Sequence, residues 1–171
     1  MKIVLLGYMG SGKSTIGKAL AQYLQCDFMD LDAYIETEQG MAIAELFKAK
    51  GEIFFRREES RALKAVLAQN DSLVLALGGG TPCYGTNMDD ILEHATTSVY
   101  LDMSIPALVE RLTHEKAQRP LIAHLADEEL GEFIGKHLFE RRPFYRKAAH
   151  IINCDDKSVA AIVNEIRNLL Q

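Results

Sequence analysis

The fold is decided by one stretch near the start of the chain, Gly7-Tyr8-Met9-Gly10-Ser11-Gly12-Lys13-Ser14-Thr15. It follows the apolar run Ile3–Leu6, which predicts a short strand buried on both faces. It precedes a segment whose apolar residues recur at helical spacing, Ile16, Leu20 and Leu24. A sequence of the form G-x-x-x-x-G-K-[ST] between a strand and a helix predicts a phosphate-binding loop.

This loop has a simple physical basis for holding phosphate. Glycines allow backbone N–H groups to turn towards the anion, and the positive end of the following helix points at the same place. We expect Lys13 to reach the β- and γ-phosphates and the Ser14 hydroxyl to bind Mg²⁺. The predicted nucleotide-binding residues of the loop are Gly10, Ser11, Gly12, Lys13, Ser14 and Thr15. A glycine-rich turn that only begins a helix is the alternative, and the strand–loop–helix order disfavours it.

Length and composition limit the possible classes of protein. A chain of 171 residues fits one domain, so we assign residues 1–171 to a single unit. The net charge of −5 argues against a nucleic-acid or membrane-surface partner, and any anion site must be a local cluster of arginines. No apolar run is long enough to span a bilayer. The three cysteines are odd in number and scattered, which favours reduced thiols in the cytoplasm. We expect a monomer.

Two further strands are predicted to end in polar or glycine-rich segments. In the first, Cys26–Asp32, the carboxylates of Asp30 and Asp32 would project to the same side of an extended segment. The second, Ser72–Leu77, ends in Gly78–Gly80, which would leave the backbone open to a ligand. A flexible turn is the alternative, but ligands of open α/β sheets gather at the carboxyl ends of strands. Because no acid closes this strand, the aspartate pair is the candidate acidic partner for a metal.

Two arginines are predicted to face the interior. Arg56 lies seven residues before Leu63 on an apolar helical stripe, and Glu59 falls on the same stripe. Arg141 lies eleven residues after Leu130, which is three turns of a second helix. An inward arginine needs an anion, because burying it unpaired costs several kcal/mol. For Arg56 this anion is either Glu59, in an ion pair that only stabilises the helix, or a ligand.

The remaining segments predict an alternating α/β order. Further strands are expected at Thr97–Asp102 and His150–Asn153, and alternation with helices predicts a parallel sheet covered on both faces. Residues 113–126 mix charges with proline and lack periodicity, which is typical of a mobile lid that would carry Arg119 over the phosphates. An ordinary exposed loop is the alternative. Helices are expected over 16–24, 33–39, 42–50, 51–68, 104–112, 127–142 and 159–169.

The motifs taken together resemble the shikimate kinase family over nearly the whole chain. They are Gly7–Thr15 with Gly17, Asp30-x-Asp32, Phe55-Arg56 with Glu59, Gly78–Gly80, Arg119-Pro120-Leu121 and Arg141-x-Pro143-Phe144-Tyr145. The resemblance implies a single-domain P-loop kinase with a five-stranded parallel sheet in the order 2-3-1-4-5. It also implies transfer of the ATP γ-phosphoryl group to the 3-hydroxyl of shikimate, with Mg²⁺ as the metal.

The resemblance also implies roles for individual residues. Catalytic roles fall to Lys13, Asp32 and Arg119, with Asp32 holding the acceptor hydroxyls and Arg119 also binding the nucleotide. Asp30 would sit near Mg²⁺, through water. The acceptor site would consist of Asp32, Arg56, Gly78, Gly79, Gly80 and Arg141, with the two arginines gripping the shikimate carboxylate. The family more often has Ala-Val where this chain has Thr81-Pro82, a change in the wall of that pocket.

Inward arginines suit a carboxylate or a phosphate equally, so two other classes of function stay open. One is another small-molecule kinase of this fold, such as a gluconate kinase or a nucleotide kinase. The other is a non-catalytic nucleotide-binding module, although no Asn-Lys-x-Asp guanine motif is present.

Overall fold

The structure is a computed structural model that describes residues 1–69 and 72–171. Its strands are β1 (Lys2–Leu6), β2 (Asp27–Asp30), β3 (Leu73–Ala76), β4 (Thr97–Asp102) and β5 (His150–Asn153). Its α-helices are α1 (Lys13–Leu24), α2 (Leu31–Gln39), α3 (Ile43–Ala68), α4 (Asn87–His94), α5 (Ile105–Glu115), α6 (Asp127–Tyr145) and α7 (Val159–Leu169). Short 3₁₀ helices cover Thr81–Cys83 and Lys116–Gln118.

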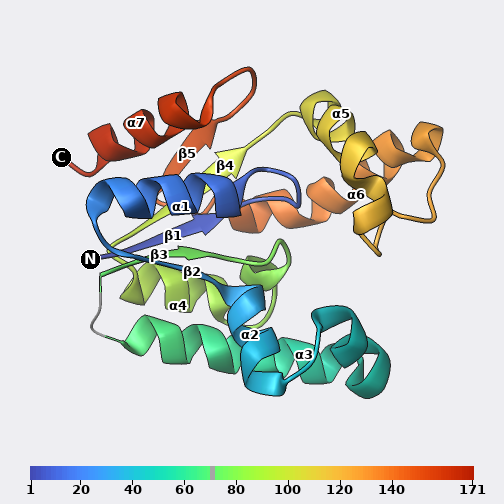
Figure 1. Ribbon diagram of the computed structural model, residues 1–171, viewed down its shortest axis with the longest axis horizontal. Coiled ribbons are helices and arrows are strands. Elements are labelled where there is room, and N and C mark those ends of the chain that lie inside the picture. The colour runs from blue at the N-terminus through green and yellow to red at the C-terminus, as the bar shows by residue number, and fades with distance from the viewer. Residues whose placement is uncertain (70–71) are drawn as a thin grey trace.

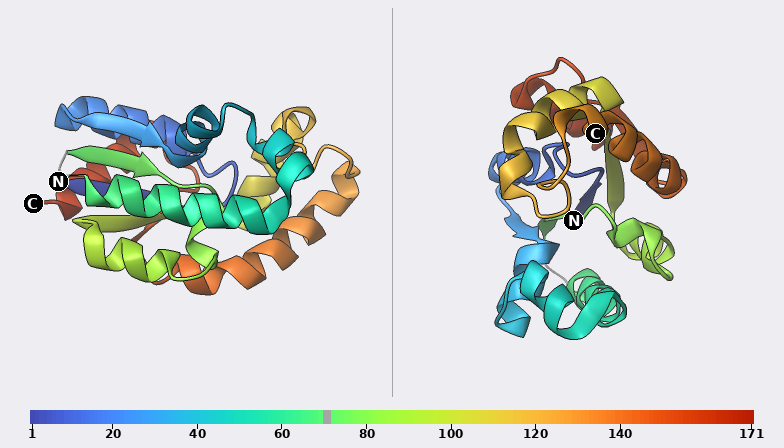
Figure 2. Two further views of the ribbon diagram at one scale, coloured as in Figure 1. Left: turned by 90° about the horizontal axis from the view of Figure 1, so that it is seen from below. Right: turned by 90° about the vertical axis from the view of Figure 1, so that its right-hand side faces the viewer.

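Within the described ranges the five strands form one parallel sheet in the order β2-β3-β1-β4-β5, which confirms the predicted fold. Helices α1 and α7 lie on one face of the sheet, and α3 and α4 lie on the other (Figure 1; Figure 2). Both faces are therefore covered, and the central strands β1 and β3 are buried almost throughout, as parallel strands are.

The strand register brings three loops to one rim of the sheet. Asp30 of β2 pairs with Ala76 of β3, and Leu5 of β1 pairs with the same residue. The segments that follow β1, β2 and β3 therefore begin at the same level. Both chain termini lie at the opposite end of the sheet (Figure 1).

The aspartate pair differs from its predicted conformation. Helix α2 begins directly after Asp30, so Asp32 lies in its first turn and not on an extended strand. The prediction of a shared extended segment is therefore wrong. The cause is capping: Asp30 Oδ1 accepts hydrogen bonds from the backbone N–H groups of Asp32 (3.0 Å) and Ala33 (3.3 Å), which favours helix at this point.

Helix α6 extends past the predicted end at Arg142 and includes Pro143. A proline inside a helix removes its own backbone N–H and its ring crowds the carbonyl four residues earlier, so this turn depends on other contacts. The last turn is held by Tyr145, whose side chain is fully buried and whose hydroxyl donates to the carbonyl of Gly79 (2.5 Å).

Other boundaries follow the sequence closely. Gly51 has a φ of 84° and interrupts α3 where two separate helices were predicted. Ser104 begins α5 as its N-cap, with Oγ accepting from the N–H of Ala107 (3.2 Å). Helix α4 was not predicted.

Among the residues that the structure describes, no helix is long and apolar enough to cross a membrane.

Candidate functional site

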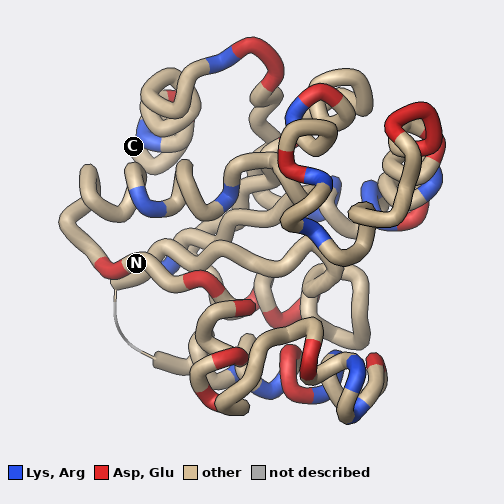
Figure 3. The backbone as a smooth tube through the Cα atoms, turned by 45° about the vertical axis from the view of Figure 1, so that its right-hand side comes forward, with Lys and Arg blue, Asp and Glu red and all other residues tan. Residues whose placement is uncertain are grey.

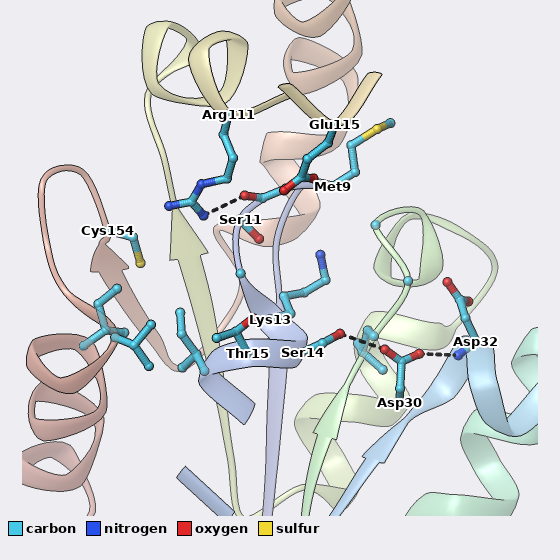
Figure 4. A pocket seen from close by; sticks show the side chains of 18 of the residues that line it. Met9, Ser11, Lys13, Ser14, Thr15, Asp30, Asp32, Arg111, Glu115 and Cys154 are labelled. Atoms are coloured by element: carbon cyan, nitrogen blue, oxygen red, sulfur yellow. Dashed lines mark hydrogen bonds between the residues drawn. The ribbon is translucent and has the colours of Figure 1, made fainter. Parts of the chain in front are cut away.

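The phosphate-binding loop leaves the start of α1 open. Gly10 and Gly12 have φ values of 78° and 89°, a region that side chains other than glycine rarely adopt. Gly12 is the N-cap of α1 and provides no side-chain acceptor, so the first N–H groups of the helix remain available to an anion. The loop and its surroundings are drawn in Figure 4.

Lys13 extends from the first turn of α1 into the pocket (Figure 4). Its Nζ donates to the carbonyls of Gly7 (2.8 Å) and Tyr8 (2.9 Å), which holds the ammonium group against the loop. Burial lowers the pKa of Lys13 to about 8, although the carboxylates of Asp32 and Asp30 oppose this shift. The ammonium group therefore sits where a bound phosphate would be its strongest partner.

Ser14 and Asp30 bring two oxygen ligands together. Ser14 Oγ donates to Asp30 Oδ2 at 2.9 Å, and both residues line the pocket. Magnesium prefers such hard oxygen donors and usually takes only one or two protein ligands beside phosphate oxygens and water. The residues present therefore fit Mg²⁺ next to the phosphate loop.

Asp32 is the carboxylate whose environment is most perturbed. Burial raises its pKa from the ordinary 3.8 to about 6, and the neighbouring Asp30 and Glu59 add to this shift. Lys13 and Arg56 oppose it. A carboxylate with a pKa near neutrality can accept a proton at physiological pH, as a general base must.

The glycine triplet after β3 faces one functional side chain per residue. A Cβ atom placed on Gly78 would lie 2.9 Å from Asp32 Oδ1. One on Gly79 would lie 3.0 Å from Arg141 Nη1 and 3.6 Å from the backbone N of Met9 in the phosphate loop. One on Gly80 would lie 2.8 Å from both Nη atoms of Arg56. We call these six residues the acceptor ladder: Asp32, Arg56, Arg141, Gly78, Gly79 and Gly80.

Arg56 forms the predicted ion pair with Glu59 and also lies against Gly80. Its Nη1 donates to Glu59 Oε1 at 2.8 Å. The guanidinium lies over the ring of Tyr84, 4.0 Å from the ring centroid. Arg56 therefore pairs with Glu59 while it lies against Gly80, and its binding of a ligand stays a prediction. Sequence reasoning missed Tyr84, which no spacing pattern links to Arg56.

The predicted lid segment packs against the domain. Arg119 lines the pocket, with its Nε and Nη2 donating to Glu115 Oε2 at 3.0 and 2.6 Å. Ile122 is fully buried and anchors the segment in the core. Glu115 was not predicted, although its position four residues before Arg119 is a usable helical signal. Arg111, which the family resemblance suggests near adenine with its role left open, lines the pocket and donates to the carbonyl of Gly10 at 2.8 Å.

A cavity of about 560 Å³ joins these groups at the rim of the sheet. The predicted residues among its lining are Gly10, Ser11, Gly12, Lys13, Ser14, Thr15, Asp30, Asp32, Gly78, Gly79 and Arg119. Gly80, Arg56 and Arg141 lie beside this lining, at the far end of the ladder. Figure 3 shows lysines and arginines interspersed with acidic residues along the chain, and the cavity lining contains both signs as well.

These features define the class of P-loop kinases. The phosphate loop, the open helix N-terminus and the hydroxyl–carboxylate pair all lie at the carboxyl ends of a parallel sheet in the order 2-3-1-4-5. The comparisons identify the family within this class. The family model described as shikimate kinase matches residues 9–171. The chain belongs to the shikimate kinase family.

Individual shikimate kinases match this chain over nearly their whole length. A shikimate kinase of Flavobacterium johnsoniae is 44% identical over 99% of this chain and 98% of its own. The crystal structure of a shikimate kinase from Bacteroides thetaiotaomicron is 37% identical, with a TM-score of 0.93 over 99% of this chain and 98% of that one. A structure of the Acinetobacter baumannii shikimate kinase in complex with shikimate is 31% identical, with a TM-score of 0.88 over 99% of this chain and 92% of that one.

Proposed function

We propose that this protein is an ATP-dependent shikimate kinase, which transfers the γ-phosphoryl group of ATP to the 3-hydroxyl of shikimate. The observation that carries the proposal is the acceptor ladder, in which a carboxylate and two guanidinium groups lie along a glycine triplet beside the phosphate loop. Shikimate offers hydroxyls and a carboxylate, which match these groups in kind. Two arginines orient a carboxylate better than lysines would, because each guanidinium can donate two parallel hydrogen bonds.

In this proposal, Arg56 and Arg141 bind the acceptor carboxylate and Asp32 holds the 3-hydroxyl. The bond between the γ-phosphorus and the oxygen shared with ADP breaks, and a bond from that phosphorus to the 3-oxygen forms. The hydroxyl proton passes to the Asp32 carboxylate, whose raised pKa of about 6 suits a proton acceptor. Holding the hydroxyl in line with the phosphoryl group is itself a large part of the catalysis.

The phosphate side of the site supplies positive charge. Lys13 would contact the transferred group, and Arg119 would do so after leaving Glu115 as residues 113–126 close over the nucleotide. Ser14 would bind Mg²⁺ directly, and Asp30 through water. When bound, Mg²⁺ neutralises charge on the β- and γ-phosphate oxygens.

We further propose that the protein acts as a monomer in the cytoplasm, with shikimate and ATP as its partners and neither nucleic acid nor membrane among them. Free thiols at Cys26, Cys83 and Cys154 support the reducing compartment.

A coupled assay of ADP release with Mg-ATP tests the proposed reaction. Shikimate, gluconate and nucleoside monophosphates are supplied in parallel to the same enzyme. With Mg-ATP present, we expect turnover only when shikimate is the acceptor. Turnover with gluconate or a nucleotide in place of shikimate would contradict the proposal, and ATP binding without any acceptor turnover would indicate a nucleotide-binding module.

A further inference from the structure

A buried polar chain leads from α4 to the acceptor ladder. Thr81 Oγ1 donates to Glu59 Oε2 at 2.7 Å, while Glu59 Oε1 accepts from Arg56 Nη1 at 2.8 Å. On the other side, Asn87 Nδ2 donates to the backbone carbonyl of Thr81 at 2.8 Å. Glu59, Thr81 and Asn87 are each at most 1% exposed. These three residues therefore rely on protein partners, and not on bulk water, for these hydrogen bonds.

Burial makes each of these hydrogen bonds consequential. A carboxylate at the position of Glu59 needs partners for both oxygens, because a buried charge without them is strongly destabilising. Its two oxygens are divided between the Arg56 guanidinium and the Thr81 hydroxyl. The hydroxyl therefore fixes the direction in which the carboxylate presents its other oxygen to Arg56.

Thr81 is also the residue that directly follows the glycine triplet. Its hydroxyl ties the triplet to α3, and its carbonyl ties the triplet to α4 through Asn87. One residue thus sets the position of Arg56 and of the Gly80 backbone against which that arginine lies.

We propose that Thr81 and Asn87 are positioning residues for the acceptor carboxylate, acting through Glu59 and Arg56. This inference rests on the proposed shikimate kinase activity. Both side chains are fully buried, so neither is open to the acceptor. Their loss should weaken acceptor binding and leave nucleotide binding unchanged.

The primary test compares Thr81→Val, which keeps the shape and removes the hydroxyl, with Thr81→Ser, which restores it. We expect the KM for shikimate to rise about 5- to 20-fold in Thr81→Val, which is part of the cost of losing a hydrogen bond to a charged group, because Arg56 keeps its own bond to Glu59. The KM for ATP should stay within about twofold, and Thr81→Ser should lie close to the wild type in both. Ser98→Ala is the matched control, since Ser98 is a buried hydroxyl remote from the ladder that bonds the N–H of Ala149.

A purely structural role for Thr81 would lower the melting temperature in Thr81→Val, as in Ser98→Ala, without changing the ratio of the two KM values. That result would overturn the inference. A double-mutant cycle adds a second criterion: in an Arg56→Ala background, Thr81→Val should raise the shikimate KM no further. Independent, multiplying effects would contradict action through Arg56.

Asn87→Ser keeps the test decisive if Thr81→Val does not fold. It acts on the Thr81 carbonyl alone, so we expect a smaller rise in the shikimate KM, of about two- to fourfold. An unchanged shikimate KM in whichever variant folds would overturn the inference. Failure of the wild type to phosphorylate shikimate would instead contradict the proposed function, so the two failures are distinguishable.

Discussion

The two halves of the site are built in different ways. The phosphate loop is one continuous stretch, residues 7–15, and its groups are fixed by backbone conformation and by the start of α1. The acceptor ladder takes one side chain each from α2, α3 and α6 and sets them against three glycines after β3. The first half is defined locally, while the second depends on how four segments pack together.

This difference predicts different consequences of mutation. Changes in the phosphate loop should act on the phosphoryl group and impair turnover whatever the acceptor concentration. Changes to the arginines of the ladder should act on one substrate, a change to Asp32 should act on turnover as well, and changes that only reposition a side chain should have the smallest effects.

The largest effect is expected for Lys13→Ala. Removing the ammonium group from the transferred phosphoryl should lower kcat by at least about 10³-fold. Because Lys13 bonds only carbonyls of its own loop, the fold should persist, as circular dichroism would show. Lys18→Ala, an exposed lysine of the same helix, is the control and should keep its activity. Wild-type turnover in Lys13→Ala would refute the assignment of this half of the site.

The next effect is expected for Asp32→Asn, which should lower kcat by about 10²-fold through loss of the base. The same change should stabilise the protein. The native pKa of about 6 lies above the ordinary 3.8, so ionised Asp32 destabilises the native state. This penalty is absent below about pH 4, grows between pH 4 and 6, and is complete above pH 6.

Denaturant melts should therefore show Asp32→Asn more stable than wild type by roughly 1–3 kcal/mol at pH 7.5 and no more stable at pH 3.5. In the wild type, kcat/KM for shikimate should rise with pH and level off above about pH 6. Equal stability of the two proteins at pH 7.5 would show that the Asp32 carboxylate is not held in an unfavourable environment.

A smaller effect, confined to one substrate, is expected for Arg141→Ala. The KM for shikimate should rise about 10- to 100-fold, which corresponds to roughly 1.4–2.7 kcal/mol. The KM for ATP should change less than about threefold, because ATP binds at the other half of the site. Arg57→Ala, which removes an exposed arginine of α3, should leave both constants unchanged. Equal rises in both KM values would contradict the separation of the halves.

The smallest of these four effects is expected for Gly80→Ala. The added methyl group would lie 2.8 Å from the Arg56 guanidinium, too close for a normal contact, so the end of the arginine side chain must shift. We expect the shikimate KM to rise about three- to tenfold, or roughly 1 kcal/mol. Gly131→Ala in α6 is the matched control, because its methyl group would meet Val109 Cγ2 at an ordinary 3.8 Å. Identical shikimate KM values in the two variants would show that Arg56 need not lie against Gly80.

The difference between locally defined features and features that depend on packing also explains which parts of the structure the sequence predicts well. The phosphate loop, the sheet order and most helix boundaries depend on local motifs and periodicity, or on a family resemblance that the strand pairings confirm. Inward positions for Arg56 and Arg141 also followed from helical spacing. Their alignment with individual glycines depends on packing between elements, which spacing within one helix does not contain.

The incorrect or missed features have physical reasons of the same kind. Asp32 lies in a helix and not in the predicted strand because Asp30 caps α2, and the extended pattern before Asp30 contains no sign of that cap. Helix α4 is short, with only Asn87, Met88 and Ile91 buried, which gives a weak periodic signal. The pairing of Arg119 with Glu115 reflects one conformation of residues 113–126, and closure of that segment stays a prediction.

Calorimetric titration of shikimate into Lys13→Ala tests the central claim most directly, with Arg56→Ala titrated in parallel. If the two halves bind their substrates separately, Lys13→Ala binds shikimate with wild-type affinity although it cannot turn over, while Arg56→Ala binds it at least about tenfold more weakly. Loss of shikimate binding in Lys13→Ala, or wild-type affinity in Arg56→Ala, would contradict the account.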